Sequence, residues 1–276
     1  MGRMDGKVAL ITGAARGQGR SHAVRLAEEG AEIIAIDVCD QIGSVPFAMG
    51  TGDDLAETAK MVENLDRRIV TSVADVRDSA QLQGAVELGL SEFGHIDVVC
   101  ANAGIASMGL TWELTDEQWQ DVIDVNLTGV WKTIKAVIPT LIEQGTGGSI
   151  IITSSMASEK GLAGIAHYTA TKHGVIGLMR SLVNEVSPYN IRVNCVCPTT
   201  VNTPMIHNDA FYQYAGGTTA DEMGAVFKAL NALPVPWVEA VDISNAVLFL
   251  ASDESRYVTG LSLWVDAGLG TKVGAG

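Results

Sequence analysis

The chain has 276 residues, of which 47% are hydrophobic and only 5% aromatic, so it can bury one sizeable core packed mainly by aliphatic side chains. Its formal net charge of −14, without a cluster of lysines and arginines, argues against nucleic acid or an anionic membrane surface as a partner. Because the sequence has no basic and apolar leader and no apolar run of membrane-spanning length, we expect a cytoplasmic protein.

The four cysteines favour buried, reduced thiols. Three of them lie in or at the ends of apolar runs that are typical of strands. Cys195 and Cys197 alternate along one such run, so their side chains face opposite ways and make a poor clamp for a metal or a disulfide. We therefore predict no metal site.

The first predicted element is a buried parallel strand over residues 7–12, and the glycine-rich segment 13–19 leads from it into a helical pattern. Strand, glycine turn and helix are the context of a phosphate cradle. Gly13 allows the tight turn, Gly17 lets the backbone approach a pyrophosphate, and Gly19 lets the helix pack closely. The helix N-terminus adds amides and a favourable dipole. Alone, the glycines also fit an ordinary tight turn.

The next predicted strand, residues 32–37, ends in Asp37, 24 positions after Gly13. A dinucleotide-binding fold places near this position the acid that binds the adenosine ribose hydroxyls. Because that carboxylate would repel a 2′-phosphate, NAD is favoured over NADP, although Arg16 could meet such a phosphate. Residues 40–54 lack periodicity and predict a loop beside the adenosine half of the cofactor, which it could cover.

A third strand is predicted over residues 68–76, with Asp75 placed to meet the adenine amino group. A fourth strand over residues 96–104 ends in small residues that let a ribose or nicotinamide lie close to the backbone. Residues 119–136 predict one long helix with Asn126 in its middle. A mid-helix asparagine is mildly unfavourable, so we expect it either to face solvent or to serve a site.

Residues 148–154 and 190–198 predict two further strands. Residues 199–237 contain many breakers together with scattered methionines and aromatic residues. A substrate lid would lie there, although a pair of short helices that cap the core fits the pattern too. A helix over residues 242–251 and a strand over residues 261–266 complete the chain.

Ser155, Tyr168 and Lys172 form the candidate catalytic group. Tyr168 and Lys172 are four residues apart in an apolar-periodic segment, so a helix places their side chains on one face. An ammonium there favours the phenolate and moves the pKa of Tyr168 toward neutrality, which makes the tyrosine a usable proton carrier. Ser155 follows a predicted strand, and its hydroxyl could hold a substrate oxygen beside the phenol. Alone, the pair also fits an ordinary amphipathic helix.

The alternation of strands and helices predicts an α/β fold. We expect a single-domain Rossmann fold, with a doubly wound parallel sheet of about seven strands and helices on both faces. In such a sheet, ligands bind at the carboxyl ends of the strands. The glycine turn, Asp37, residues 102–104, Ser155 and Tyr168 all fall at or just beyond predicted strand ends, so we expect them to meet in one site.

Over essentially its whole length, the chain resembles the short-chain dehydrogenase/reductase family. The matching residues are Thr12-Gly-x-x-x-Gly-x-Gly19, Asp75, Asn102-Ala103-Gly104, Asn126, Ser155 and Tyr168-x-x-x-Lys172. Each motif is weak alone, but together they are highly specific. The resemblance implies an oxidoreductase that interconverts a secondary alcohol and a ketone, with NAD as its cofactor.

The resemblance also implies residue roles. Tyr168 would be the general acid/base, and Ser155 would orient the substrate oxygen. Lys172 would bind the nicotinamide ribose and lower the pKa of the tyrosine, while Asn126 would hold a water in a proton relay. The implied cofactor contacts are Gly13, Arg16, Gly17, Gln18, Gly19, Asp37, Val38, Asp75, Val76, Asn102, Ala103, Gly104, Tyr168, Lys172, Pro198, Val201 and Thr203.

Two departures narrow the resemblance. The family commonly has Pro-Gly after the sixth strand, whereas Pro198 is followed here by threonine. The loss of this glycine leaves open how the backbone meets the cofactor carboxamide, which Thr203 could still reach. The interval from Asp37 to Asp75 is also longer than usual, which places a loop insertion at 40–54. Both features resemble the mycofactocin-associated, carveol dehydrogenase-like branch, whose members are thought to hold NAD without free exchange.

An acidic chain with an apolar lid suggests a neutral, hydrophobic substrate such as a terpenoid alcohol or ketone, for example carveol. Residues 199–227 contain no Arg or Lys, which disfavours a carboxylate clamp there. The branch implies a mycofactocin-type redox acceptor as a partner, and the family implies a homotetramer.

Three alternatives stay open. One is an ordinary member of the family that exchanges NAD freely and acts on another alcohol. Another is a non-catalytic dinucleotide sensor, which would have no use for Ser155, Tyr168 and Lys172 together. The last is a sugar epimerase or dehydratase with bound NAD, although such enzymes usually carry a larger C-terminal domain.

Overall fold

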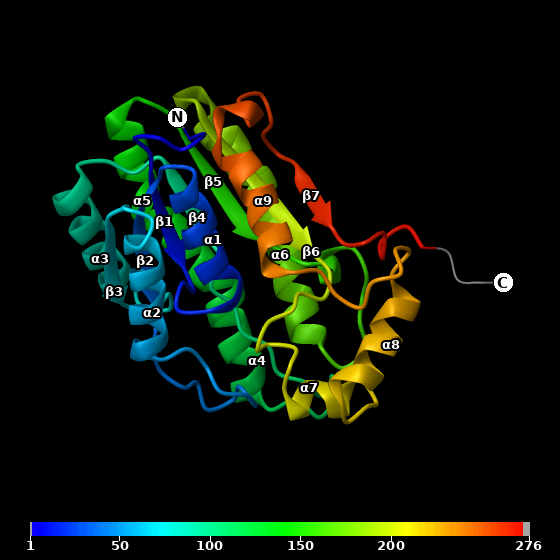
Figure 1. Cartoon of the computed structure of the whole chain (residues 1–276). Coiled ribbons are helices and arrows are strands. Elements are labelled where there is room, and N and C mark those ends of the chain that lie inside the picture. The colour runs from blue at the N-terminus through cyan, green and yellow to red at the C-terminus, as the bar shows by residue number, and fades with distance from the viewer. Residues whose placement is uncertain (1, 273–276) are drawn as a thin grey trace.

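Seven strands form one sheet in the computed structural model, which describes residues 2–272. The strands follow the order β3-β2-β1-β4-β5-β6-β7, and each neighbouring pair is parallel. Their bounds are β1 Val8–Thr12, β2 Glu32–Asp37, β3 Ile69–Val73, β4 Val98–Ala101, β5 Gly148–Thr153, β6 Ile191–Pro198 and β7 Ser262–Val265. The predicted fold class is confirmed, and the strand order reverses between β1 and β4 (Figure 1).

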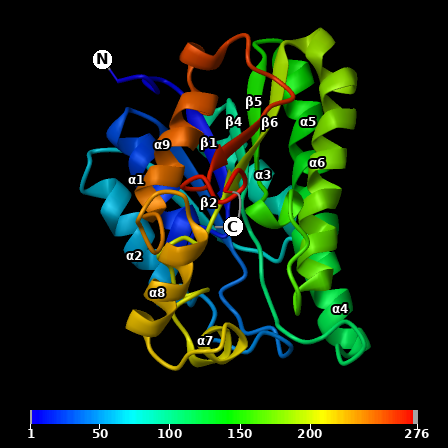
Figure 2. The same ribbon diagram turned by 90° about the vertical axis from the view of Figure 1, so that its right-hand side faces the viewer.

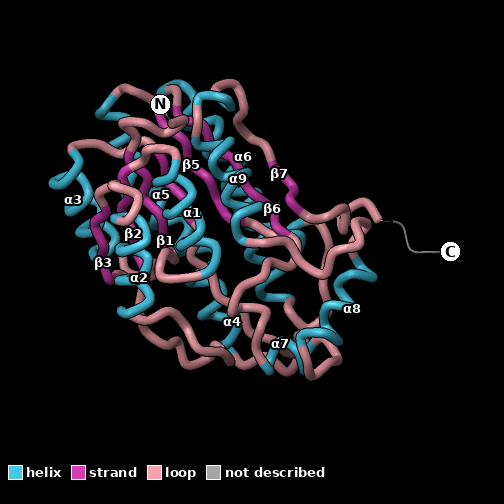
Figure 3. The backbone as a smooth tube through the Cα atoms, viewed as in Figure 1, coloured by secondary structure: helices cyan, strands magenta, loops and turns pink. Residues whose placement is uncertain are grey.

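Helices cover both faces of this sheet (Figure 3). One face carries α1 Gly17–Glu28, α2 Gly52–Glu63 and α9 Ala240–Ala251. The other face carries α3 Ser79–Phe93, α5 Val130–Gln144 and α6 Ala166–Val186. None of the helices within residues 2–272 has the length and apolarity needed to span a bilayer.

The residues of β1 show why both faces are covered. All five are buried. Val8 and Leu10 enter the core beneath α3, α5 and α6, whereas Ala9 and Ile11 enter the core beneath α1, α2 and α9. Because successive side chains of a strand point to opposite faces, a continuous apolar run requires a sheet that is buried on both sides.

Two predicted strands end earlier than expected. The strand predicted over residues 68–76 ends at Val73, and the one predicted over residues 96–104 ends at Ala101. Asp75 and Asn102 therefore lie just beyond the strands, where their side chains can face a site at the edge of the sheet.

The single long helix predicted over residues 119–136 is wrong in its middle. Instead, α4 Asp116–Ile123 leads into a π-helical segment, η1 Asp124–Gly129, and α5 begins at Val130. This wider turn holds Asn126 fully buried, so the alternative in which it faces solvent is excluded. Short π segments inside helices are frequent at functional sites.

Short helices and loops gather at the carboxyl ends of the strands. Residues 38–51, which follow β2, contain no helix or strand. The chain after β6 forms α7 Asp209–Tyr214 and α8 Ala220–Leu230, so the predicted pair of short helices is present. In two perpendicular views, these segments and α4 lie at the same end of the molecule (Figures 1 and 2). Three single-turn helices complete the list: η2 Met156–Ser158, η3 Ser187–Tyr189 and η4 Asp253–Ser255.

Leu10→Ala tests the core. Leu10 is fully buried in the central strand, so its truncation should lower the free energy of unfolding by about 2–5 kcal/mol. Leu88 on α3 is 42% exposed, and Leu88→Ala should change the same quantity by less than about 1 kcal/mol. Urea unfolding followed by circular dichroism measures both, and equal losses would contradict this core.

Candidate active site

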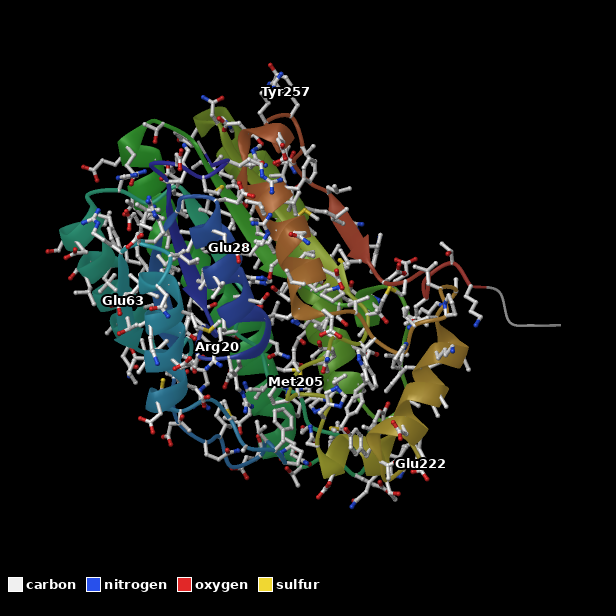
Figure 4. All side chains as sticks on the ribbon, viewed as in Figure 1. Arg20, Glu28, Glu63, Met205, Glu222 and Tyr257 are labelled. Carbon is white, nitrogen blue, oxygen red and sulfur yellow. The ribbon has the colours of Figure 1, made fainter. Side chains whose placement is uncertain are left out.

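Two adjoining cavities lie at the carboxyl ends of the strands. The glycine-turn cavity, of about 920 Å³, surrounds the turn between β1 and α1, and the tyrosine cavity, of about 1020 Å³, surrounds Tyr168. Figure 4 shows Met205 at this end of the molecule and Tyr257 at the opposite end. The residues that line both cavities are Gln18, Asn102, Gly104, Thr203 and Met205. One ligand can therefore extend from the first cavity into the second.

The glycine turn leaves almost no space for side chains. Gly13 has a φ of +69°, and a Cβ atom there would lie 2.9 Å from the Ala103 Cα. A Cβ atom on Gly19 would lie 2.0 Å from the Gly13 carbonyl oxygen, so only glycine lets α1 pack against the turn. α1 begins at Gly17 without a side-chain cap from Arg16, which leaves its first amides available to an anion.

Thr12 and Thr153 connect the ends of three strands. Thr12 Oγ1 accepts hydrogen bonds from the amides of Asn102 and Ala103, both at 3.1 Å. The Asn102 side chain donates to the Thr12 carbonyl at 3.0 Å, and Thr153 Oγ1 donates to Asn102 Oδ1 at 3.2 Å. From the sequence, Thr12 was recognised only as the first residue of the glycine motif, and Thr153 was not singled out. The one available signal was a hydroxyl residue at the end of an otherwise apolar strand.

Asp37 ends β2 and lines the glycine-turn cavity. Its carboxylate accepts hydrogen bonds from the amides of Ala15 at 2.9 Å and Cys39 at 3.2 Å. A Cβ atom on Gly50 would lie 3.5 Å from Asp37 Oδ1. The segment 38–51 therefore folds back onto this carboxylate.

Arg16 joins the glycine turn to the same segment. Its guanidinium donates a hydrogen bond to the carbonyl of Ala48. Burial lowers the pKa of Arg16, and the charges of Asp54 and Asp37 oppose that shift. The guanidinium thus has a partner within the chain, in addition to the cofactor contact predicted for Arg16.

A small apolar cluster anchors segment 38–51. Its buried members are Ile42, Val45, Val76, Leu82, Ile105, Val122 and Val125. Phe47 and Met49 pack against this cluster and also line the glycine-turn cavity. Ser44 Oγ donates to Asp121 Oδ2 at 2.7 Å, which ties the segment to α4.

Asp75 and Val76 follow β3 and line the glycine-turn cavity. Arg77 pairs with Asp75 at 2.7 Å and with Asp121 at 3.2 Å. Burial raises the pKa of the Asp75 carboxyl, but hydrogen bonds from Arg77 outweigh burial and bring the pKa below its ordinary value. Because this carboxylate already has a partner, its contact with an adenine amino group stays a prediction.

Lys172 and Tyr168 lie on one face of α6, where Lys172 Nζ is 5.4 Å from the centroid of the Tyr168 ring. Nζ donates to the Thr153 carbonyl at 2.8 Å, and burial lowers the pKa of Lys172 to about 8. Burial also raises the pKa of Tyr168, and hydrogen bonding with Ser155 opposes that shift. The expected lowering of the tyrosine pKa by Lys172 is therefore not found: the ammonium lies over the ring and bonds to Thr153, and desolvation dominates.

Ser155 reaches the tyrosine cavity from the end of β5. It is the N-cap of η2, and its Oγ accepts a hydrogen bond from the Ala157 amide at 3.1 Å. The preceding Ser154 donates to the Lys172 carbonyl at 3.1 Å. These bonds fix the loop against α6 and place Ser155 beside Tyr168.

Asn126 lies behind the cavities and lines neither. Its Oδ1 accepts from the Ile105 amide and its Nδ2 donates to the Ile105 carbonyl, both at 2.8 Å. The π-helical turn thereby holds the segment that follows β4. The water relay implied for Asn126 stays a prediction.

The other predicted cofactor residues all border the two cavities. Val38 lines the glycine-turn cavity, and Pro198 and Val201 line the tyrosine cavity. Gln18 Oε1 and Thr199 Oγ1 are buried without a hydrogen-bond partner, so both have bonding capacity left for a ligand. Within residues 2–272, no three His, Cys, Asp or Glu side chains are grouped so that they could hold a metal ion.

The chain is similar in sequence and in structure to several known oxidoreductases. Residues 7–211 match the family described as short chain dehydrogenase. The (−)-trans-carveol dehydrogenase of Rhodococcus erythropolis is 50% identical over 273 residues, which cover 97% of this chain and 99% of that protein. The crystal structure of carveol dehydrogenase from Mycobacterium avium in complex with NAD has a TM-score of 0.97 at 53% identity and covers 99% of this chain and 100% of that chain. A short chain dehydrogenase from Mycobacterium paratuberculosis bound to NAD has a TM-score of 0.92 at 44% identity, with 98% and 100% covered.

Thr12→Val tests the connection between the strand ends. The variant keeps the shape of the side chain but leaves the amides of Asn102 and Ala103 without their acceptor, so the free energy of unfolding should fall by about 2–4 kcal/mol. Thr12→Ser keeps the oxygen and should lose only about 1 kcal/mol. If urea unfolding gave both variants the same stability, the hydroxyl would not be what joins the two turns.

Proposed function

Because the chain belongs to the short-chain dehydrogenase family, we propose that it is an NAD-dependent enzyme that oxidises a hydrophobic secondary alcohol to a ketone, with Tyr168 as the proton acceptor. The single observation that carries the proposal is the meeting of Ser155, Tyr168 and Lys172 in an apolar cavity that adjoins the glycine turn. A sensor would need the glycine turn but not this group.

The glycine-turn cavity fits NAD. The uncapped start of α1 suits a pyrophosphate, and the Asp37 carboxylate suits the hydroxyls of an adenosine ribose. The unpartnered Gln18 Oε1 lies where the two cavities meet and can accept a hydrogen bond from the bound cofactor. NAD bound there supplies the hydride acceptor.

The chain itself handles the proton. Ser155 holds the substrate oxygen, and the Tyr168 oxygen accepts the proton of the alcohol as the carbonyl forms. Because burial raises the pKa of Tyr168, the phenolate needed for oxidation becomes more abundant as the pH rises. Oxidation should therefore be favoured in alkaline solution, and ketone reduction, which needs the phenol, at lower pH.

Lys172 and Asn126 support that proton transfer. The Lys172 Nζ lies 5.4 Å from the centroid of the Tyr168 ring, and beyond its bond to the Thr153 carbonyl it has donors left to bind ribose hydroxyls. We assign Asn126 the water of a proton relay, since each polar atom of its amide has capacity beyond the single bond it makes to Ile105.

The lining of the tyrosine cavity supports a neutral, apolar substrate. Among the described residues that line it, Lys172 is the one charged side chain. Most of the remaining surface is apolar, with Met108, Met156, Leu162, Ile165, Met205, Ile206 and Phe211 among the contributors. An anionic substrate would be desolvated there without a second cation. A terpenoid alcohol such as carveol fits this chemistry, and α7 and α8 would close over it as the lid within 199–237.

We further propose that NAD is held tightly and that segment 38–51 is its cover. The Arg16 contact with Ala48 and the Ser44 contact with Asp121 fix this segment at two points beside the glycine-turn cavity. With slow exchange of NAD, a mycofactocin-type redox acceptor would reoxidise the bound cofactor.

A cytoplasmic homotetramer completes the proposal. All four cysteines are free, which suits a reducing compartment. Trp131 on α5 is 44% exposed and Trp264 on β7 is 37% exposed, so the long helices and the last strand offer apolar surface for further copies to bury.

Tyr168→Phe removes only the phenolic oxygen. Turnover of a cyclic secondary alcohol should fall by about 10²–10⁴-fold, while NADH binding, followed by fluorescence, should stay near that of the wild type. Tyr189→Phe is the matched control, because Tyr189 is 45% exposed and lines neither cavity. A Tyr168→Phe variant as active as the control would contradict the role of the tyrosine.

A single-turnover assay tests the held cofactor. After extensive dialysis, anaerobic addition of carveol without free NAD should give about one NADH per active site and then stop. Added NAD should not restore the reaction, whereas an artificial electron acceptor should restart it. Continuous turnover that depends on free NAD would instead identify an ordinary, freely exchanging dehydrogenase.

A further inference from the structure

Residues 266–272, called here the C-terminal turn, follow β7 and wrap around one carboxylate. Asp266 Oδ1 accepts a hydrogen bond from the Gly268 amide at 2.9 Å, and Oδ2 accepts one from the Gly270 amide at 2.8 Å. The Leu269 amide donates to the Asp266 carbonyl at 2.9 Å. One residue therefore fixes three successive amides in a segment without regular structure.

The backbone of the C-terminal turn is strained and supported. Ala267 has a φ of +51°, in the left-handed region that residues with a Cβ atom rarely adopt. Its carbonyl accepts hydrogen bonds from the amides of Ala232 and Leu233, both at 3.0 Å. A strained conformation held from several sides is characteristic of segments shaped for a site.

Two lysines tie the C-terminal turn to neighbouring segments of the chain. Lys160, in the loop that follows Ser155, donates from Nζ to the Leu269 carbonyl at 2.7 Å. Lys272 donates from Nζ to the carbonyl of Asn231, just beyond α8, at 2.8 Å. The turn thus bridges the loop that follows Ser155 and the end of α8, the helix proposed as part of the lid.

Leu269 lines the tyrosine cavity, together with Met156 and Phe211. Gly270 packs on the same wall, because a Cβ atom there would lie 3.2 Å from the Met156 Cε. Met156 directly follows Ser155 in the chain. Leu269 therefore belongs to the substrate side of the site and not to the glycine-turn cavity, which it does not line.

We propose that Leu269, held by Asp266 and Lys160, sets the largest alcohol that the tyrosine cavity accepts. This inference rests on the proposed function, because it concerns the substrate of that same site. Bonds at both its amide and its carbonyl keep the Leu269 backbone from moving aside, so apolar bulk on the ring of a secondary alcohol meets its side chain directly. The substrate class is a neutral cyclic alcohol whose apolar substituent fits against this wall.

Leu269→Ala and Leu269→Phe change the volume of the wall in opposite directions. Cyclohexanol and 4-cyclohexylcyclohexanol are the small and large probes, since they differ only in apolar bulk. The ratio of kcat/KM for the large probe to that for the small one is measured with NAD present. We expect Leu269→Ala to raise this ratio and Leu269→Phe to lower it, each by about tenfold, mainly through KM.

Two further variants distinguish a direct effect of the Leu269 side chain on substrate size from a general disturbance of the structure. Leu233→Ala removes the same side chain from a residue beside the C-terminal turn that is 58% exposed and does not line the cavity, so the ratio should not change. Lys160→Met keeps the aliphatic stem but loses the bond to the Leu269 carbonyl. It should shift the ratio in the direction of Leu269→Ala by a smaller factor.

Calorimetry gives a second readout that does not need turnover. The dissociation constants of both probes are measured for the complex with NADH, and their ratio should follow the same pattern. If the wild type binds both probes but oxidises neither, the proposed dehydrogenase activity is contradicted. The ratio of the dissociation constants still tests whether Leu269 limits the size of the bound alcohol. An unchanged ratio in folded Leu269→Ala and Leu269→Phe variants, or no binding of either probe by the wild type, would overturn the inference.

Discussion

The hydrogen bond from the buried Lys172 ammonium to the Thr153 carbonyl is the interaction on which the site depends. A buried ammonium must find partners within the protein, and this carbonyl, 2.8 Å away, ties α6 to the end of β5. Tyr168 lies one turn earlier on the same face, so the same bond sets the position of the phenol. Burial lowers the pKa of Lys172 to about 8, because a charged ammonium is costly away from water.

Several of the irregular segments around the site are held by a carboxylate. Asp37 accepts from the amides of Ala15, in the glycine turn, and of Cys39, in segment 38–51. Asp121 receives both Ser44 and Arg77, and Asp266 holds the C-terminal turn. Part of the acidic excess of the chain thus has a structural use. Asp37 and Asp266 accept hydrogen bonds from backbone amides that no strand or helix satisfies, and Asp121 binds side chains of two other segments.

Local patterns were sufficient for much of the site. The apolar runs predicted the parallel strands, and the glycines of the first turn occupy the crowded positions expected for Gly13 and Gly19. The spacing of Tyr168 and Lys172 predicted one helix face, which the 5.4 Å approach of Nζ to the ring confirms. Each of these features depends on residues that are neighbours in the chain or on the period of one element.

The sequence by itself therefore determined the α/β fold, the glycine turn and the shared helix face of Tyr168 and Lys172, because repeating backbone geometry translates directly into sequence period. Only the tertiary structure decided the π-helical turn. Asn126 in this turn bonds to Ile105, which lies in a different segment, and the apolar period of a helix does not reveal the one additional residue that a π-helical turn contains. The tertiary structure also decided the sign of the Tyr168 pKa shift, because burial depends on every element packed around the phenol. The place of Leu269 in the cavity was set in the same way, by Lys160, a residue more than a hundred positions away.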